Sequence, residues 1–234
     1  MNSADIKNFV FQRGAVLCGI AHIDRFNDAP QGFGPLDLYP QTQSVISFAL
    51  QVPKSTLALK TGIPYTVGEI VSLQNSHRMA LDLVLYLENK GYEAVMVPSE
   101  PYEYWDVERR TGKGLVSLKH IANRCGLGVF GKNHLLYNAQ YGSLMRLGAV
   151  LTNARLDSDP MLDKEICKSS CKLCATSCPA GAISESGVDQ LKCRSFCEGK
   201  TAKGDLIYTC NLCRRICPNV SGVRVNTGSE KASL

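Results

Sequence analysis

Nine of the eleven cysteines lie between residues 167 and 217, and this clustering constrains the chain more than any other feature. Two runs share the spacing Cys-x2-Cys-x3-Cys-Pro, at residues 171–179 and 210–218. Short gaps of this kind let thiolates wrap one corner of a four-iron cluster, while the cysteine before proline ligates a second cluster. A zinc site also accepts cysteine pairs, but it does not explain a third cysteine and a proline that occur twice. The pattern predicts two [4Fe-4S] clusters in a ferredoxin-like unit.

Two such clusters take four thiolates each, and the segment offers nine. Seven of these fit the pattern directly: Cys171, Cys174, Cys178, Cys193, Cys210, Cys213 and Cys217. Cys167 and Cys197 compete for the eighth place, and Cys167 is favoured because it keeps the local wrap intact. The expected ligand sets are then Cys167, Cys171, Cys174 and Cys217 for one cluster, and Cys178, Cys193, Cys210 and Cys213 for the other.

The arrangement of the cysteines also indicates the compartment. Clustering at gaps of two and three residues favours metal ligation in a reducing environment over a disulfide framework. The N-terminus has no basic start followed by an apolar run, and no window approaches the ~18 apolar residues of a membrane span. We therefore expect a cytoplasmic protein with no membrane contact.

The formal net charge of +5 is mild, and no Lys/Arg block is longer than two residues. Most of the excess lies beside the cysteines, since the sequence from residue 161 onward has eleven Lys and Arg but only seven Asp and Glu. Bases in this position can offset the negative charge of thiolate-bound clusters. A nucleic-acid partner is therefore not expected.

Strands and helices alternate through about residue 155, which is typical of an α/β layered domain, here of the mixed α+β kind. Ser3 is expected to cap the first helix. Further helices are expected over about 66–90 and over 117–126. Strands are expected at 16–23, 44–52 and 92–98, and two more within 134–153 around a tight turn at 140–142. The predicted organisation is a layered domain over 1–160, a double-cluster domain over 161–222 and a loose tail over 223–234.

Residues 126–131 read GLGVFG and match the dinucleotide-binding fingerprint letter for letter. That fingerprint needs a strand before it and a helix after it. Here the predicted helix comes first and a strand follows, so nicotinamide binding is not expected. The glycines instead indicate a backbone that bends sharply or lies close to something, with Lys132 and Asn133 supplying polar ends.

Residues 117–153, followed by the two cysteine runs and by GDLIYTCNLCRRICPN (204–219), resemble epoxyqueuosine reductases and, more distantly, reductive dehalogenases. The resemblance covers about residues 115–219 well and the N-terminal part in outline. It implies a nitroreductase-like domain before a double-cluster domain, with a cobalamin between them that receives electrons from the nearer cluster. Flavin is the other option, since nitroreductase-like folds more often carry it. The candidates for binding this cofactor are Gly126, Gly128, Gly131, Lys132 and Asn133.

The sequence departs from that family where its catalytic acid would stand. The family has an Asp-Ser-Ala-Pro stretch, but residues 98–101 read PSEP, with Pro98 in place of the aspartate. Tyrosines and carboxylates both serve as general acids near a reacting group. The candidate proton donors are therefore Glu100, Tyr102, Tyr104 and Asp106, against the competing interpretation of a solvated loop. The chain also ends soon after Cys217, without the helical-repeat extension of the tRNA-modifying enzymes, which disfavours a tRNA substrate.

The expected function is an iron–sulfur reductase that acts on a small substrate through its own cobalamin or flavin. Its electron donor would be a ferredoxin or a flavodoxin. The alternative is an electron-transfer or reductive-activation protein that serves a partner such as a corrinoid protein. Epoxyqueuosine reduction on tRNA is a second alternative. A homodimer is expected by analogy with nitroreductase-like domains.

Overall fold

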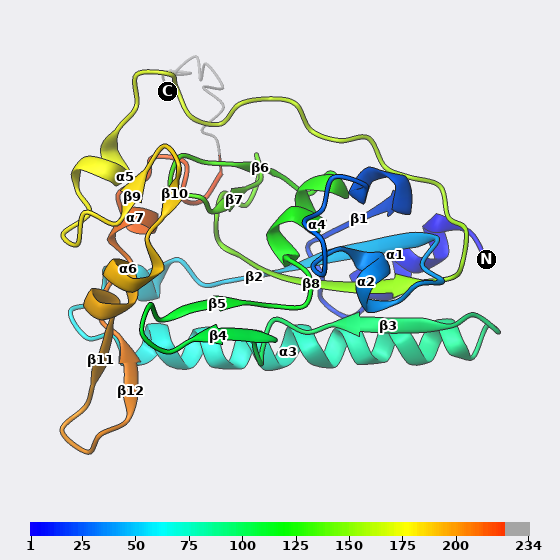
Figure 1. Cartoon of the computed structure of the whole chain (residues 1–234), viewed down its shortest axis with the longest axis horizontal. Coiled ribbons are helices and arrows are strands. Elements are labelled where there is room, and N and C mark those ends of the chain that lie inside the picture. Colours follow the sequence, from blue (N-terminus) through cyan, green and yellow to red (C-terminus); the bar gives the residue numbers. More distant parts are fainter. Residues whose placement is uncertain (223–234) are drawn as a thin grey trace, which may run out of the picture.

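A four-stranded sheet forms the centre of the computed structural model, which describes residues 1–222 (Figure 1). Its strand order is β1 (Leu17–His22), β2 (Ser44–Gln51), β8 (Met145–Thr152) and β3 (Ala94–Val97). Every neighbouring pair is antiparallel, and Ile46 of β2 lies opposite both Ile20 and Val150. The domain is therefore of the mixed α+β kind, without parallel crossovers. The tail expected at 223–234 lies outside the described residues.

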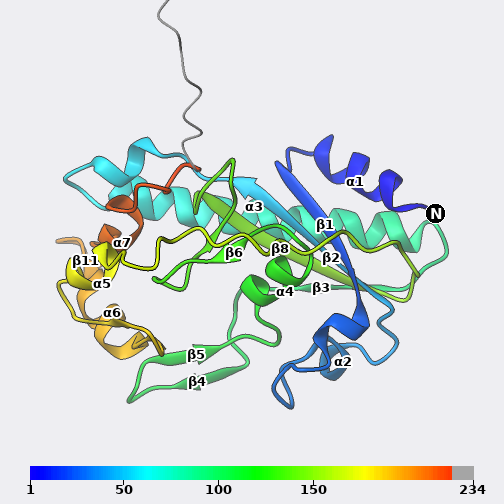
Figure 2. The same cartoon turned by 90° about the horizontal axis from the view of Figure 1, so that it is seen from above.

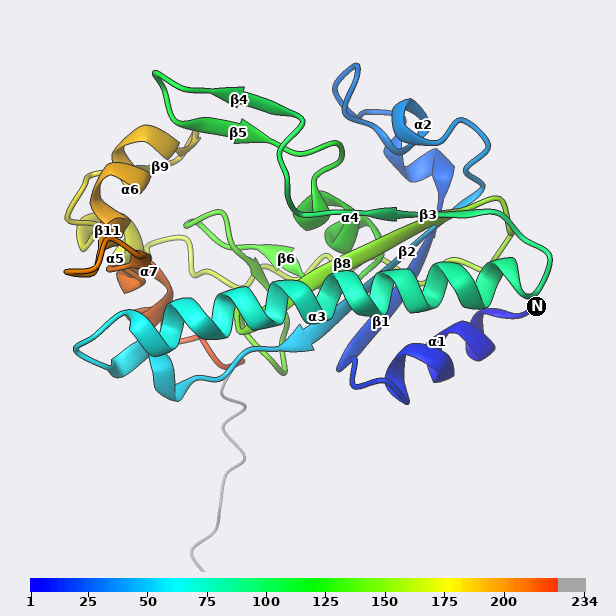
Figure 3. The ribbon, with the colours of Figure 1, turned by 90° about the horizontal axis from the view of Figure 1, so that it is seen from below.

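Helices cover both faces of this sheet, and α3 runs along one of them (Figure 3). On that face α1 (Ser3–Phe11) and α3 (Ile63–Glu88) pack against Ile46 and Phe48 of β2. On the other face α4 (Leu118–Arg124) packs against Val45 and Ala49. Side chains alternate across a strand, so a strand covered on both faces must be apolar nearly throughout. This explains the continuous apolar run of β2.

One local expectation was wrong, and the structure adds the strand partners to another. The first helix is capped by Asn2, whose side chain accepts a hydrogen bond from the Asp5 amide at 2.8 Å, while the Ser3 hydroxyl donates to the Asp157 carbonyl. The two strands within 134–153 exist, but they do not pair with each other. β7 (Leu136–Tyr137) pairs with β6 (Val129–Phe130), whereas β8 joins the central sheet, because the chain turns through 138–142 between them.

Residues 102–114 form a β-hairpin, most of whose residues are exposed to solvent. Its strands are β4 (Tyr104–Asp106) and β5 (Thr111–Lys113), and it extends from the sheet domain toward the cysteine segment, residues 161–222 (Figure 2). The remaining short elements of the N-terminal part are α2 (Pro35–Leu38) and two 3₁₀ turns, Ile23–Phe26 and Ser55–Ala58.

The cysteine segment lies at the end of the molecule opposite the N-terminus (Figure 1). After β8 the chain returns past β1, where Asp159 accepts a hydrogen bond from the Ile20 amide at 2.9 Å, and then reaches the cysteines. The elements that follow are α5 (Leu173–Thr176), β9 (Ile183–Ser184), β10 (Gly187–Val188), α6 (Gln190–Cys197), β11 (Glu198–Lys200), β12 (Leu206–Tyr208) and α7 (Leu212–Arg215). β12 rests on the first turn of α3, because the Tyr208 amide donates to the Thr66 hydroxyl at 2.8 Å. Within residues 1–222, no helix has the length and apolar character needed to cross a bilayer.

Two glycine substitutions test this packing. A Cβ on Gly19 of β1 would lie 2.0 Å from the Cys125 carbonyl oxygen, whereas a Cβ on Gly68 of α3 would have no neighbour within 4 Å. We expect Gly19→Ala to lower the free energy of unfolding by about 1–3 kcal/mol through overpacking. Gly68→Ala should raise it by about 0.5–1 kcal/mol, since alanine is the better helix former. Thermal unfolding of both variants checks this, and an unchanged Gly19→Ala protein would contradict the close packing of β1 on α4.

Candidate functional site

The two cysteine runs fold in the same way. Each wraps a short helix, α5 or α7, that contains the middle cysteine of the run. The amide of the last cysteine then donates to a carbonyl three residues earlier, from Cys178 to Ala175 and from Cys217 to Arg214, at 3.3 Å in both cases. The two helices also pack against each other. The repeat in the sequence is therefore a repeat of structure, with the two copies side by side.

The thiols gather in two neighbourhoods. Burial raises the pKa of Cys174, and the nearby Cys167 and Cys171 thiols raise it as well. Burial also raises the pKa of Cys213 to about 11, and its neighbours there are a different set of thiols: Cys193, Cys210 and Cys178. Cys178 belongs to the first run by sequence but lies near the second run in space. The position of Cys178 is compatible with crossed ligand sets, and the assignment of all eight ligands stays a prediction.

The end of the second run returns to the start of the first. The Asn219 side chain donates a hydrogen bond to the Ile166 carbonyl at 2.9 Å, which brings the residues after Cys217 beside those before Cys167. The Cys217 thiol itself lies against the Tyr137 hydroxyl. Within residues 1–222, no three histidine, cysteine or carboxylate side chains come close enough to hold a single metal ion. In a four-iron cluster each thiolate binds its own iron, so its ligands do not need to converge on one point.

Cys197 is a fifth thiol in the second neighbourhood. It lies four residues after Cys193 on α6, and a hydrogen bond between the two side chains lowers the pKa of Cys193 to about 7. The same contact raises the pKa of Cys197, to which burial adds. Cys167, in contrast, lies near Cys174 and Cys171, where only three other ligands are expected.

Lys132 and Asn133 bind the cysteine segment directly. The Lys132 ammonium donates to the carbonyl oxygens of Ser169 and, at 3.1 Å, Cys171 in the first run. The Asn133 amide donates to the Cys213 carbonyl at 3.1 Å in the second run and to the Tyr137 hydroxyl at 2.8 Å. One pair of residues from the sheet domain therefore contacts both runs.

The three glycines before them pack against the chain itself. A Cβ on Gly126 would lie 2.2 Å from the Pro160 carbonyl oxygen, and one on Gly128 would lie 2.4 Å from the Tyr137 carbonyl oxygen. A Cβ on Gly131 would lie 2.6 Å from the Tyr137 ring. As expected, a helix precedes this stretch and a strand follows it. The expectation that these glycines contact a cofactor is not supported by their positions, because internal packing already requires them and none lines the cavity described next.

A cavity of about 1460 Å³ lies between the sheet domain and the cysteine segment. One wall carries five thiols, namely Cys178, Cys193, Cys197, Cys210 and Cys213. The facing walls come from the 98–102 stretch, the end of the β4–β5 hairpin, α4 and the loop 133–135. Asn133 is the one candidate cofactor ligand from the 126–133 stretch that lines it. The second thiol neighbourhood thus borders the cavity, and the first does not.

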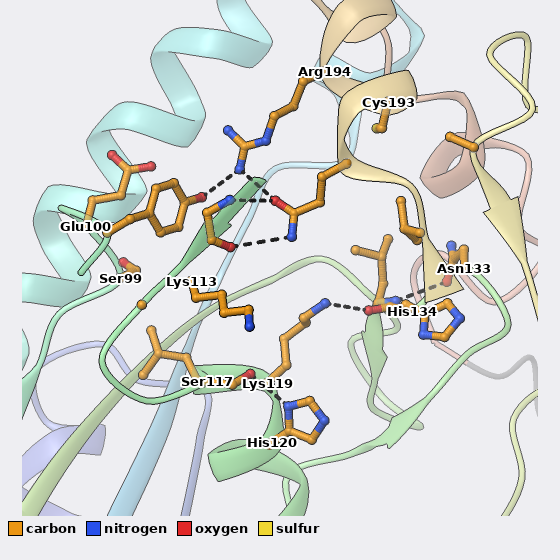
Figure 4. A pocket seen from close by; sticks show the side chains of 18 of the residues that line it. Ser99, Glu100, Lys113, Ser117, Lys119, His120, Asn133, His134, Cys193 and Arg194 are labelled. Atoms are coloured by element: carbon orange, nitrogen blue, oxygen red, sulfur yellow. Dashed lines mark hydrogen bonds between the residues drawn. The ribbon is translucent and has the colours of Figure 1, made fainter. Parts of the chain in front are cut away.

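Two of the four candidate proton donors lie at this cavity. Glu100 and Tyr102 line it, and the Tyr102 hydroxyl accepts a hydrogen bond from Arg194 at 3.1 Å (Figure 4). Tyr104 and Asp106 do not line it. The Asp106 carboxylate accepts a hydrogen bond from the Arg109 amide, and the Tyr104 ring lies near the Lys113 ammonium.

Several residues that line the cavity or fasten its walls are not marked by any sequence pattern. Lys113 and Lys119 extend into it from β5 and α4 (Figure 4). Arg194 of α6 stacks on Tyr102 and Trp105, and Gln190 exchanges hydrogen bonds with the backbone of Gly112. These contacts fasten the hairpin to α6. No motif signals them, since they are single polar residues from segments far apart in the chain.

The chain is related in sequence to epoxyqueuosine reductases, as the resemblance implied. It is 27% identical over 217 residues to the epoxyqueuosine reductase of Bacillus cereus, covering 87% of this chain and 55% of that protein. The chain spans about half the length of the curated relatives it matches. No protein-family model matches it.

The fold is shared with epoxyqueuosine reductases and with reductive dehalogenases. An epoxyqueuosine reductase solved with an epoxyqueuosine-modified tRNA stem loop superposes with a TM-score of 0.64 at 17% identity, over 92% of this chain and 64% of that one. A catabolic reductive dehalogenase superposes with a TM-score of 0.70 at 19% identity, over 92% of this chain and 31% of that one. At these identities the superpositions establish the fold alone. The sequence relatives are consistent with iron–sulfur oxidoreduction.

Lys132 provides a test of how the first run is held. We expect Lys132→Met to speed iron release to a chelator about tenfold, because two charge-assisted hydrogen bonds to the run are lost. Lys168→Met is the matched control, since this exposed lysine directly follows Cys167 and its side chain makes no hydrogen bond to the described residues. Equal release rates for the two variants would contradict a holding role for Lys132.

Proposed function

We propose that this protein is an iron–sulfur oxidoreductase in which two [4Fe-4S] clusters pass single electrons to a cobalamin, or to a flavin, held in the cavity between residues 1–160 and residues 161–222. A small substrate would be reduced in the same cavity. The observation that carries the proposal is the wall of five thiols on a cavity of about 1460 Å³. Electrons leaving the second thiol neighbourhood would enter this cavity without crossing the protein.

The donor set fits the clusters. Four-iron clusters are held by thiolates, and the crossed neighbourhoods supply Cys178, Cys193, Cys210 and Cys213 beside the cavity, with the first set behind them. The assignment of Cys167, Cys171, Cys174 and Cys217 to the other cluster is supported by the Asn219–Ile166 contact, which brings the two ends of the segment together.

The size of the cavity suits a large cofactor. Pockets for drug-sized ligands measure about 300–1,000 Å³, and this one exceeds that range. A bound corrinoid or flavin would supply the reductive chemistry, which belongs to the cofactor and not to the side chains. The chain's own contribution is to bind and orient: Asn133 presents its amide at the cavity wall, and the hairpin held by Arg194 covers one side.

Protons for the reduction would come from Glu100 and Tyr102. Both lie on the cavity wall, and the Arg194 guanidinium that donates to the Tyr102 hydroxyl fixes the position of the phenol. A general acid must come within hydrogen-bond reach of the reacting group, and a donor fixed on the cavity wall would be placed to reach a molecule bound there. Tyr104 and Asp106 are not retained as donors, because they do not line the cavity.

Two other functions have specific support. A carrier that delivers electrons to a corrinoid protein would use the same clusters, with the cavity as a docking recess. A tRNA substrate is supported by the relatives, which are epoxyqueuosine reductases, one of them solved with a modified tRNA stem loop. This relation weighs against our expectation that nucleic acid is not a partner.

Assaying epoxyqueuosine-containing tRNA with the reduced protein tests the tRNA substrate directly. The ferredoxin or flavodoxin donor and the homodimer stay predictions.

Metal and cofactor analysis tests the main proposal. Anaerobic purification should yield about eight irons per chain, four for each cluster. Cobalt in equimolar amount, or a flavin spectrum, is expected after reconstitution with the corresponding cofactor. Iron with neither, after reconstitution with both, would contradict a resident catalytic cofactor and leave the electron carrier.

The eighth ligand can be tested by paired substitutions. We expect Cys197→Ser to keep both clusters, because four other thiols already surround that position. Cys167→Ser should lower the iron content by about half, to about four per chain, because the first neighbourhood offers no substitute. Iron analysis and the cluster absorbance of both variants check this. The reverse outcome would place Cys197 in the cluster and overturn the assignment of Cys167.

A further inference from the structure

A second, smaller cavity of about 220 Å³ adjoins the main one, and we call it the inner pocket. Four residues line both cavities, so the two spaces meet there: Ser99, Leu118, Lys119 and Leu135. The remaining walls of the inner pocket come from α3, from the stretch that leads into β8, and from α7. Its charged lining consists of Lys119, Arg146 and Arg214 and the single carboxylate of Glu69.

Two arginines share one carboxylate in this pocket. Arg146 of β8 and Arg214 of α7 both form ion pairs with Glu69 of α3, the second at 3.1 Å. The Arg214 side chain is only 15% exposed and uses a single nitrogen, Nη1, for its hydrogen bonds to Glu69 and to the Tyr65 hydroxyl. Within residues 1–222 its Nε and Nη2 donate to no partner. A guanidinium with two unused nitrogens, Nε and Nη2, is suited to a carboxylate or phosphate group, which it can bind through two parallel hydrogen bonds.

Lys119 adds a third cation at the boundary with the main cavity. Its ammonium donates to the His134 carbonyl at 2.9 Å and forms no ion pair with a carboxylate of the described part of the chain. Its side chain is exposed overall, and partial burial of the ammonium lowers its pKa. The pocket therefore holds three cationic side chains against the one carboxylate of Glu69. This local excess of positive charge favours the binding of an anion.

Ser143 gives an independent indication. Its hydroxyl is buried, lies beside the Tyr137 hydroxyl and lines the inner pocket, and it is the one buried side-chain polar atom within residues 1–222 that makes no hydrogen bond of good geometry. Buried polar groups nearly always have a partner, which can be a ligand. The pocket is also several times larger than the ~30 Å³ share of one water molecule, so it has room for an oxyanion.

We propose that the inner pocket binds an oxyanion, a carboxylate or phosphate group, between Arg214, Lys119 and the Ser143 hydroxyl. Because the pocket shares lining residues with the main cavity, the anion is either an arm of a molecule bound there or a free inorganic ion. The first source rests on the proposed function, since it needs an occupant of the main cavity. The site itself does not, because its charges are present without one.

Titration calorimetry with inorganic phosphate and with acetate tests the site in the anaerobically purified full-length protein. We expect saturable binding of one anion per chain that weakens as sodium chloride is added. Lys119→Gln should weaken it about tenfold, and Ser143→Ala by a few-fold. Lys113→Gln is the matched control, because this lysine lines the main cavity but not the inner pocket, and its affinity should equal that of the unaltered protein.

Repeating the titration with cobalamin bound separates the two sources. Loss of phosphate binding would assign the pocket to an arm of the occupant, and retained binding would assign it to a free anion. Absence of saturable binding to both anions would overturn the proposal. An equal loss in Lys113→Gln and Lys119→Gln would also overturn it, because the anion would then lie in the main cavity. Iron and cobalt content are measured separately, so failure of this site is distinct from failure of the proposed function.

Discussion

The hydrogen bonds of Lys132 and Asn133 to the two cysteine runs set the position of everything else in the site. Lys132 binds carbonyl oxygens in the first run, and Asn133 binds the Cys213 carbonyl in the second. The loop that carries them is held in place because Gly128 and Gly131 lie against Tyr137 with no room for a side chain. Both runs are therefore aligned on one short loop of the sheet domain. The thiols near Cys213 then form the wall of the large cavity.

A buried ionic contact provides the second attachment. Arg214 follows Cys213 directly and pairs with Glu69 of α3, close to where the Tyr208 amide meets Thr66. Removing such charges from water has a free-energy cost that is offset only when each has a partner with good geometry. The Arg214–Glu69 pair therefore fixes the position of α7 on α3, and its net contribution to the free energy of unfolding is expected to be small. The β4–β5 hairpin, which is fastened to α6, is the third attachment. The cavity lies between these three contacts of the sheet domain with the cysteine segment.

The sequence alone predicted much of this arrangement, because the relevant signals are local. The cysteine spacing indicated crossed sets, and the neighbours of Cys213 in the structure include Cys178, as expected. Apolar periodicity located β2 and α3 to within a few residues. The glycines of 126–131 were noticed correctly as close approaches. These glycines, however, pack against Tyr137 and Pro160 of the same chain. A glycine in a sequence indicates a close contact but does not identify the residue that makes it.

What the sequence could not predict depends on contacts between distant segments. Nothing near Glu69 indicates that Arg146 and Arg214 will both reach it, since the three come from α3, β8 and α7. The pairing of β7 with β6 was missed because the turn at 138–142 is compatible with a simple hairpin to β8. Asn2 was overlooked as the helix cap because Ser3 is an equally good capping residue. The cap was decided by the reciprocal bond with Asp5.

The central claim is that two crossed sets of thiolates hold two iron–sulfur clusters, with the second beside the large cavity. The most direct test is a crystal structure of the anaerobically purified protein, with iron located by its anomalous scattering. The account predicts two separate four-iron clusters, one bound by Cys178, Cys193, Cys210 and Cys213 at the cavity wall. A single metal ion in each run, or clusters that each take all their ligands from one run, would contradict it.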